Sequence, residues 1–180
     1  MVKCGINGFG RLGRKLLRVC IEREIDIVAI NDVNMSADYM AYLLMYDSTH
    51  GRFKGHIKVQ DDVLEVNDQK IKVYKESDPK EIPWYSEEAE YIFEATGLFT
   101  TTEKAAQHFN GGAKKVIIAA SSPDAPIIMY GINTDDYNSS MKVIATGTGG
   151  AVCAAAILKE ENPAELRKYT VCYLIIPHVL

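Results

Sequence analysis

The stretch Gly8-Phe9-Gly10-Arg11-Leu12-Gly13 follows an apolar segment, residues 2–7, and opens a segment with helical periodicity, Arg11–Glu22. Asp32 follows a second apolar segment, residues 25–30, at about the 20-residue distance that is typical of dinucleotide-binding motifs. Glycines at this spacing let the backbone approach a pyrophosphate, whose charge then lies against the helix N-terminus. The alternative, a tight strand–helix turn with an incidental acid, does not explain why all three parts are in register. The sequence therefore predicts a dinucleotide-binding site at this turn.

The acid at position 32 also indicates which dinucleotide binds. The carboxylate of Asp32 can accept hydrogen bonds from the hydroxyl groups of a ribose. Its negative charge would repel the 2′-phosphate of NADP. We therefore expect NAD as the cofactor.

The rest of the chain alternates between strand-like and helix-like segments, which predicts crossover connections and a parallel sheet. Strands are expected at residues 2–7, 25–30, 91–95, 115–119, 127–130 and 142–145, and helices at 11–22, 36–46 with Ser36 as N-cap, 102–109 and 150–159. Alternating apolar residues at 56–60, 63–66 and 70–74, with a turn at Asn67-Asp68, predict an antiparallel excursion. The predicted fold class is therefore α/β, a doubly wound, Rossmann-like, mostly parallel sheet with an antiparallel excursion.

This pattern divides the chain near residue 149. Residues 1–149 are predicted to form an NAD-binding Rossmann domain, and residues 150–180 a helix followed by an apolar, strand-like tail. The helix is expected to end near Asn162-Pro163, because the residue before a proline disfavours helical geometry. The apolar run at residues 170–176 has no predicted partner strand.

Composition and charge argue against several other classes of protein. The net charge is −4 and the pI is about 5.6, with no run of basic residues, which argues against nucleic-acid binding. The start of the chain lacks the apolar core of a signal peptide, and no apolar run is long enough for a membrane span. We therefore expect a cytoplasmic protein with no membrane partner. The cysteines Cys4, Cys20, Cys153 and Cys172 have no metal-ligand spacing, so free thiols and no metal site are expected.

Five stretches of the sequence resemble the glyceraldehyde-3-phosphate dehydrogenase family. They are Gly5-Ile6-Asn7-Gly8-Phe9-Gly10-Arg11-Leu12-Gly13-Arg14, Ala29-Ile30-Asn31-Asp32, Tyr46-Asp47-Ser48-Thr49-His50-Gly51, Thr96-Gly97-Leu98-Phe99-Thr100-Thr101 and Gly111-Gly112-Ala113-Lys114-Lys115-Val116-Ile117-Ile118. The resemblance extends from residue 2 to about residue 144, which is far more than one motif could give by chance. It implies an NAD-binding domain from an oxidoreductase of glycolysis, which oxidises glyceraldehyde-3-phosphate with NAD and inorganic phosphate.

The resemblance also implies roles for individual residues. The cofactor-binding residues would be Asn7, Gly8, Gly10, Arg11, Leu12, Gly13, Asp32, Ser77, Thr96, Gly97, Phe99 and Ser121. Arg11 and Leu12 would present backbone N–H groups to the pyrophosphate, and Asp32 would bind the adenosine ribose. Phe99 would lie near the adenine and Ser121 near the nicotinamide.

One of these positions departs from the family pattern. Ser77 lies in Glu76-Ser77-Asp78-Pro79, where the family usually has an arginine beside the adenine. The loss of a stacking or charge contact is expected to weaken cofactor binding, although the backbone of this segment could still contribute.

The catalytic residues that the resemblance implies are missing. The family's nucleophile is a cysteine in Ser-Asn-Ala-Ser-Cys-Thr-Thr-Asn-Cys, directly after the strand that matches residues 142–144. This chain has Ala145-Thr146-Gly147-Thr148-Gly149-Gly150-Ala151-Val152-Cys153 there, with Gly149 at the nucleophile position and Cys153 at the second cysteine. As a substitute nucleophile, Cys153 would be displaced by one helical turn, about 5 Å, which usually abolishes catalysis. His50 is interpreted as part of a structural loop, and no other histidine matches the family's catalytic histidine.

The family's downstream catalytic domain also lacks a full counterpart here. Residues 150–180 are interpreted as its remnant, joined through a large internal deletion at Thr146-Gly147-Thr148-Gly149-Gly150. The rival interpretation makes this glycine-rich stretch a second phosphate loop, but it lacks the lysine and the spacing of a P-loop. The chain is therefore expected to be a truncated NAD-binding domain without its own dehydrogenase activity.

Three other functions remain open from the sequence. Surface that the catalytic domain would cover favours a regulatory subunit that forms hetero-oligomers with full-length homologous dehydrogenase subunits. The unpartnered run at residues 170–176 fits a non-functional, aggregation-prone product of a rearranged gene. RNA binding through the cofactor groove follows from the family resemblance alone, and the acidic composition gives it little support.

Overall fold

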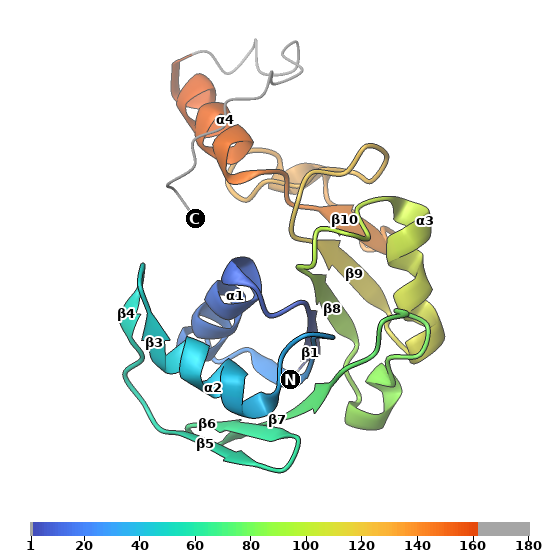
Figure 1. Ribbon diagram of the computed structural model, residues 1–180. Helices are drawn as coiled ribbons and strands as arrows, with labels where there is room; N and C mark the ends of the chain where they lie inside the picture. The colour runs from blue at the N-terminus through green and yellow to red at the C-terminus, as the bar shows by residue number, and fades with distance from the viewer. Residues whose placement is uncertain (1, 162–180) are drawn as a thin grey trace.

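An extended sheet forms the centre of the protein (Figure 1). The computed structural model describes residues 2–161, with side chains up to residue 156. The strands of the sheet are β1 (Lys3–Asn7), β2 (Asp26–Asn31), β5 (Ile57–Gln60), β6 (Val63–Val66), β7 (Gln69–Tyr74), β8 (Tyr91–Glu94), β9 (Lys115–Ile118) and β10 (Val143–Ala145). Their order is β10-β9-β8-β1-β2-β7-β6-β5. All pairs from β10 to β7 are parallel, and the pairs β7–β6 and β6–β5 are antiparallel, which confirms the predicted fold class.

Helices cover both faces of the sheet. The regular helices are α1 (Arg11–Glu22), α2 (Ala37–Met45), α3 (Thr102–Ala105) and α4 (Gly149–Glu161), and the 3-10 helices are η1 (Trp84–Glu87), η2 (Ala106–Gly111) and η3 (Thr134–Asp136). In Figure 1, α1 and α2 lie on one face of the sheet, and α3 lies on the other. The predicted N-cap of α2 is confirmed, because the Ser36 hydroxyl accepts a hydrogen bond from the Tyr39 N–H at 3.3 Å. No helix within residues 2–161 is long and apolar enough to cross a membrane.

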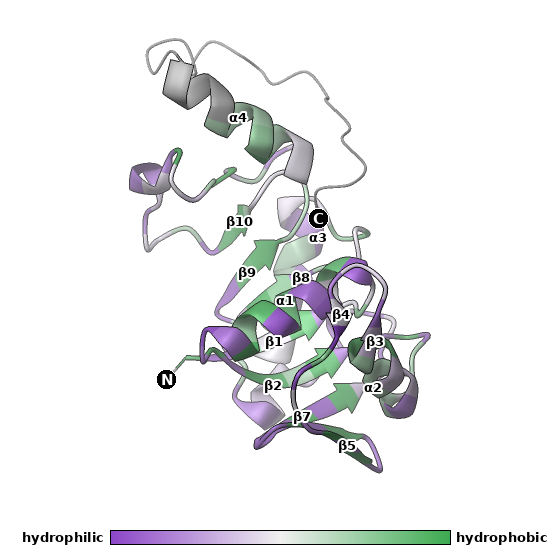
Figure 2. Cartoon of the chain, turned by 90° about the vertical axis from the view of Figure 1, so that its left-hand side faces the viewer, coloured by the Kyte–Doolittle hydropathy of each residue, from purple (hydrophilic) through white to green (hydrophobic). Residues whose placement is uncertain are grey.

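Apolar side chains fill the space on both sides of the sheet. One cluster includes Leu17 of α1 and Met40 of α2, and the other includes Trp84 of η1. Figure 2 shows that the central strands are largely hydrophobic, as a parallel sheet buried on both faces requires. Cys4 and Cys20 belong to the first cluster, and burial raises the pKa of both thiols to about 11. The two cysteines are therefore core residues with free thiols.

The predicted strand at residues 127–130 is wrong. Only a single bridge joins Ile127 to Ala145. The side chain of Asn133 donates to the Ile127 carbonyl at 2.9 Å and accepts from the Met129 N–H at 2.7 Å. The Met129 carbonyl also accepts hydrogen bonds from the N–H groups of Ile132 and Asn133, so the chain turns back after Met129 and the segment forms a loop.

The predicted helix at residues 102–109 is divided into two short helices. The α-helical part ends at Ala105, and η2 continues as a tighter 3-10 helix to Gly111. A Cβ atom at Gly111 would lie 2.0 Å from the Ile82 carbonyl oxygen, so the chain packs closely against residues 82–84 at this end. Helices commonly tighten into 3-10 geometry in their last turn.

The helix predicted from residue 150 is present as α4, which extends beyond the end of the sheet in Figure 1. The predicted helix end at Asn162-Pro163 and the apolar tail at residues 170–176 lie outside the described residues. The domain boundary near residue 149 therefore stays a prediction.

The loop that contains His50 is a small hairpin formed by β3 (Tyr46–Asp47) and β4 (Gly51–Arg52). Arg18 of α1 donates to the carbonyl groups of Leu44 at 2.6 Å and Gly51 at 2.9 Å, which fixes the hairpin on α1. The Asp47 carboxylate accepts hydrogen bonds from the backbone N–H groups of Thr49 and His50, each at 2.8 Å. The His50 ring lies 3.1 Å from the same carboxylate. His50 thus has a structural contact in this loop.

We predict that Asp47 makes the stability of the protein depend on pH at acidic values. Burial raises the pKa of Asp47. Hydrogen bonds from the backbone N–H groups of His50 and Thr49, together with the His50 ring, outweigh burial and lower the pKa to about 2. A pKa lower in the folded than in the unfolded state stabilises the fold above the unfolded value, and this stabilisation disappears as the pH falls towards 2. We expect wild type to exceed Asp47→Asn by up to about 2 kcal/mol in unfolding free energy near neutral pH.

Urea unfolding of both proteins between pH 7 and pH 2.5 measures this difference. The advantage of wild type should stay constant down to about pH 5 and shrink below about pH 4. Asp68→Asn, in the turn between β6 and β7, is the matched control. A difference between wild type and Asp47→Asn that does not change with pH would contradict the assignment.

Candidate functional site

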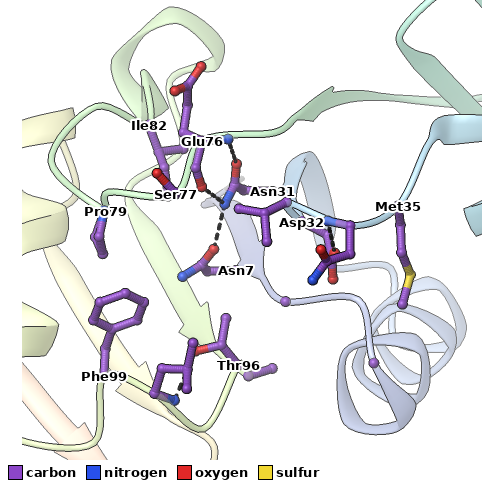
Figure 3. A pocket seen from close by; sticks show the side chains of 16 residues that line it. Asn7, Asn31, Asp32, Met35, Glu76, Ser77, Pro79, Ile82, Thr96 and Phe99 are labelled. Carbon is purple, nitrogen blue, oxygen red and sulfur yellow. Dashed lines mark hydrogen bonds between the residues drawn. The ribbon is translucent and has the colours of Figure 1, made fainter.

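A pocket of about 390 Å³ opens at the carboxyl ends of β1, β2 and β8 (Figure 3). The chain moves outward in one direction from β1 to β2 and β7, and in the other from β8 to β9 and β10. Ligands of doubly wound sheets bind where the strand order reverses in this way. The residues that line this switch-point pocket are Asn7, Gly8, Gly10, Asn31, Asp32, Val33, Asn34, Met35, Glu76, Ser77, Pro79, Ile82, Ala95, Thr96, Leu98 and Phe99.

The turn between β1 and α1 forms one wall of the pocket. Gly8 has a positive φ of 94°, and a Cβ atom there would lie 2.8 Å from the backbone nitrogen of Thr96. A Cβ atom at Gly13 would lie 2.0 Å from the Gly8 carbonyl oxygen. A Cβ atom at Gly10, in contrast, would meet no atom within 4 Å. The first and last glycines are thus required by packing, whereas Gly10 leaves open space beside the pocket.

The N-terminus of α1 can bind an anion. Gly10 is its N-cap, and no side chain caps the helix. The first intrahelical bond runs from the Arg14 N–H to the Gly10 carbonyl at 3.1 Å, so the N–H groups of the first turn have no intrahelical acceptor. These groups and the helix dipole favour a negatively charged ligand at this place.

Asp32 lies at the opposite side of the pocket mouth from Phe99 (Figure 3). Its carboxylate accepts hydrogen bonds from the backbone N–H groups of Phe9 at 2.8 Å and Asn34 at 2.9 Å. These bonds fix the acid beside the glycine turn. Each carboxylate oxygen has two lone pairs, so both oxygens can still accept a hydrogen bond from a ligand hydroxyl group.

The remaining wall suits a flat, uncharged ring. Pro79, Ile82 and Phe99 line this part of the pocket, and Figure 3 shows Phe99 and Pro79 on the same side. Ser77 also lines it. Among the described residues that line the pocket, none carries a positive charge, and Asp32 and Glu76 are acidic. An anionic group must therefore rely on backbone N–H groups for its binding.

The structure brings most of the expected cofactor residues together. Those that line the switch-point pocket are Asn7, Gly8, Gly10, Asp32, Ser77, Thr96 and Phe99. Arg11 and Gly13 lie in the first turn of α1, and Gly97 follows Thr96 with a positive φ of 74°. Ser121 is exposed after β9 and lines neither this pocket nor the hollow described next.

Leu12 lies apart from the pocket, in a hollow of about 410 Å³ between α1, the sheet and α4. The α1–α4 hollow is lined by Leu12, Leu16, Phe93, Ile117, Ala119, Ala120, Thr146, Gly147, Thr148, Gly149, Val152 and Cys153. It therefore contains both positions that the sequence singled out for catalysis, Gly149 and Cys153. Among the described residues that line the hollow, Cys153 is the only one with an ionisable side chain, and none of the others can act as its base.

Several important residues of the site were not predicted from the sequence. Asn31 lines the pocket and bonds to Asn7, with 2.8 Å between Asn31 Nδ2 and Asn7 Oδ1. Glu94 lies behind the pocket and accepts from Asn7 Nδ2 at 2.6 Å. A charged residue at the end of the apolar strand Tyr91–Glu94 is the sequence signal that could have indicated it. Within residues 2–161 no group of three or more potential ligands could hold a metal ion.

Comparison with known proteins gives the family of the chain. A sequence profile described as glyceraldehyde 3-phosphate dehydrogenase, NAD binding domain, matches residues 2–102. A glyceraldehyde-3-phosphate dehydrogenase from Sclerotinia sclerotiorum is 53% identical over 161 residues, which are 89% of this chain and 48% of that protein. Glyceraldehyde-3-phosphate dehydrogenase 2 from Drosophila melanogaster is 50% identical over 162 residues, which are 90% of this chain and 49% of that protein.

The chain thus spans about half the length of the curated relatives it matches. The matched profile includes the glycine turn, Asp32, Ser77 and Phe99, and hence every wall of the switch-point pocket. The fold, the pocket and these matches agree, and the chain belongs to the glyceraldehyde-3-phosphate dehydrogenase family, whose NAD-binding domain it carries.

Proposed function

We propose that this chain is an NAD-binding module that has no dehydrogenase activity of its own. The observation that carries the proposal is the separation of the two sites. The switch-point pocket has the groups that a dinucleotide needs, whereas the α1–α4 hollow has Gly149 at the position of the family's nucleophile. The proposal treats residues 1–149 as the binding domain, in a cytoplasmic protein related to an enzyme of glycolysis.

The residues of the switch-point pocket fit NAD. The first-turn N–H groups of α1, including those of Arg11 and Leu12, would hold the pyrophosphate beside Gly10. Asp32 would accept the hydroxyl groups of the adenosine ribose, and Phe99 would flank the adenine. Ser77 lines this part of the pocket but supplies no charge or stacking surface. When bound, NAD would supply a hydride acceptor.

The absence of a nucleophile at position 149 supports the second half of the proposal. Glycine has no side chain that could attack an aldehyde, and Gly149 begins α4 directly after the β10 strand and its loop. Cys153 lies four residues further along the helix, about one helical turn from that position. Losses of geometry on this scale remove most of the advantage of an oriented nucleophile.

A second candidate function is association with full-length homologous dehydrogenase subunits. Tyr39, Tyr42 and Tyr46 form an exposed row, and these residues are 50%, 58% and 55% exposed. The rings of Tyr39 and Tyr42 stack at 6.5 Å, and those of Tyr42 and Tyr46 lie 5.2 Å apart. The guanidinium of Arg52 lies 5.7 Å from the Tyr46 ring. Exposed aromatic and arginine side chains in a cluster are typical of protein interfaces.

Calorimetric titration of the purified chain with NAD tests the first half of the proposal. We expect saturable binding of NAD and binding of NADP that is at least about tenfold weaker, because Asp32 repels a 2′-phosphate. Asp32→Ala should weaken NAD about ten- to hundredfold, which corresponds to the loss of hydrogen bonds to a charged group. Asp32→Asn is the matched control and should reduce the preference for NAD over NADP. A folded chain that does not bind NAD would refute the proposal.

An assay of glyceraldehyde-3-phosphate oxidation with NAD and inorganic phosphate tests the second half. The purified chain should form NADH no faster than a blank without protein, because the hollow offers neither a nucleophile at position 149 nor a base. Cys153→Ser should give the same rate. If wild type is active and Cys153→Ser is not, Cys153 is a substitute nucleophile and the chain is an enzyme.

Native mass spectrometry of the chain mixed with a full-length homologue tests the association. We expect mixed oligomers, and we expect Tyr42→Glu to reduce their fraction because it places a charge within the aromatic row. Tyr85→Glu changes an exposed tyrosine outside the row and should have no effect. A chain that stays monomeric beside the homologue argues against the regulatory role.

A further inference from the structure

Glu94 carries a carboxyl group that is almost completely buried behind the switch-point pocket. The residue is 1% exposed and ends β8. Its Oε2 accepts from Asn7 Nδ2 at 2.6 Å and lies 3.0 Å from His108 Nε2. Its Oε1 accepts from the backbone N–H of Thr96 at 2.8 Å and from the Thr96 hydroxyl group. Four donors surround the carboxyl group, which suits an ionised carboxylate.

The contact with Trp84 determines which ring nitrogen of His108 carries the proton. Trp84 Nε1 can only donate a hydrogen bond, and it lies 3.1 Å from His108 Nδ1. His108 Nδ1 is therefore the acceptor, and the ring proton lies on Nε2, where it is donated to Glu94. Both Trp84 and His108 are fully buried, so water does not compete for these bonds.

The carboxylate links the end of β1 to the loop after β8, and both form part of the pocket. Asn7 directly precedes Gly8, and its Oδ1 accepts from Asn31 at the end of β2. Thr96 lies in the loop after β8, and its hydroxyl oxygen accepts from the Leu98 N–H at 3.1 Å. One buried group thus bonds to the last residue of β1 and to the loop after β8, on the two sides of the strand-order reversal.

We propose that Glu94 is a positioning residue for cofactor binding, which holds Asn7 and Thr96 in place and is itself oriented by His108 and Trp84. Glu94 does not line the pocket, so it acts through its neighbours. The proposal rests on the proposed NAD-binding function, because positioning matters only if the pocket binds its ligand. Phe99 extends the same chain of contacts, since its ring meets the His108 ring edge-on at 6.3 Å.

Glutamine cannot replace Glu94 in this arrangement, although it has the same shape. An amide nitrogen at the place of Oε2 would face the N–H groups of Asn7 and His108. At the place of Oε1 it would face the backbone N–H of Thr96. In both orientations a donor meets a donor, and at least one loop loses its anchor.

The experiment compares NAD binding by wild type, Glu94→Gln and two controls, all at a temperature at which each protein is folded. We expect Glu94→Gln to weaken NAD at least tenfold. Glu90→Gln makes the same chemical change in the segment before β8, where Glu90 pairs with Lys114 at the surface, and should not alter binding. Val66→Ala opens a cavity in β6, away from the pocket, and should lower the melting temperature without altering binding.

Hydrogen exchange of the backbone amides gives a second readout that does not need NAD. Glu94→Gln should speed exchange at Thr96 and Leu98 at least tenfold, with no change in β5 and β6. Because Trp84 is the only tryptophan in the chain, its fluorescence should also shift when its acceptor His108 moves. A structural role alone would lower stability and leave these local signals and the NAD affinity of the folded protein unchanged.

His108→Phe keeps an aromatic ring against Phe99 but removes the bonds to Glu94 and Trp84, and it serves if Glu94→Gln does not fold. Faster exchange at Thr96 together with weaker NAD binding in either variant supports the proposal. Unchanged exchange, or unchanged affinity in a chain whose wild type binds NAD, overturns it. If wild type does not bind NAD, the proposed function fails, and exchange at Thr96 alone decides whether Glu94 holds the loop.

Discussion

The contact between Gly13 and the carbonyl oxygen of Gly8 determines where α1 begins. A Cβ atom at position 13 would lie 2.0 Å from that oxygen, so the helix can approach the end of β1 only because the residue has no side chain. The approach places the first turn of α1 at the strand-order reversal, beside the loop that follows β8. The anion-binding end of the helix, the Asp32 bond to the Phe9 N–H and the pocket itself depend on this path of the backbone.

The glycine turn leaves polar side chains buried beneath the pocket, and their burial must be compensated. Asn7, Asn31 and Glu94 are each at most 3% exposed. An unsatisfied amide or carboxylate at such a place would cost several kcal/mol, roughly as much as a large core truncation. Each of these side chains is hydrogen-bonded to a neighbouring loop or strand end, which removes the penalty and fixes those loops at the same time. Rigidity of the pocket and satisfaction of its buried polar groups are thus one requirement.

The sequence was most informative where the structure depends on local spacing. The glycine turn, α1, the N-cap Ser36 and the order of strand-like segments could be predicted because each depends on residues a few positions apart. The bonds from Glu94 to Asn7 and His108 connect residues that lie 87 and 14 positions apart, and no periodicity indicates them. The same limit explains the wrong strand prediction at residues 127–130, because the backbone of this segment bonds to the side chain of Asn133. The fold class follows from patterns, whereas the partners of buried polar groups require the folded chain.

The switch-point pocket and position 149 lie on different parts of this fold, so under the proposed function NAD binding does not depend on a reactive group at position 149. The pocket is built by the ends of β1, β2 and β8 and by the segment around Ser77, all within the residues that match the family's NAD-binding domain. Position 149 lies after β10, in a hollow whose lining includes no residue of the switch-point pocket. The glycine at this position has no reactive side chain and does not line the switch-point pocket. Conversely, a change at Glu94 would disturb the pocket and leave position 149 as it is, so cofactor affinity and reactivity can change independently in this chain.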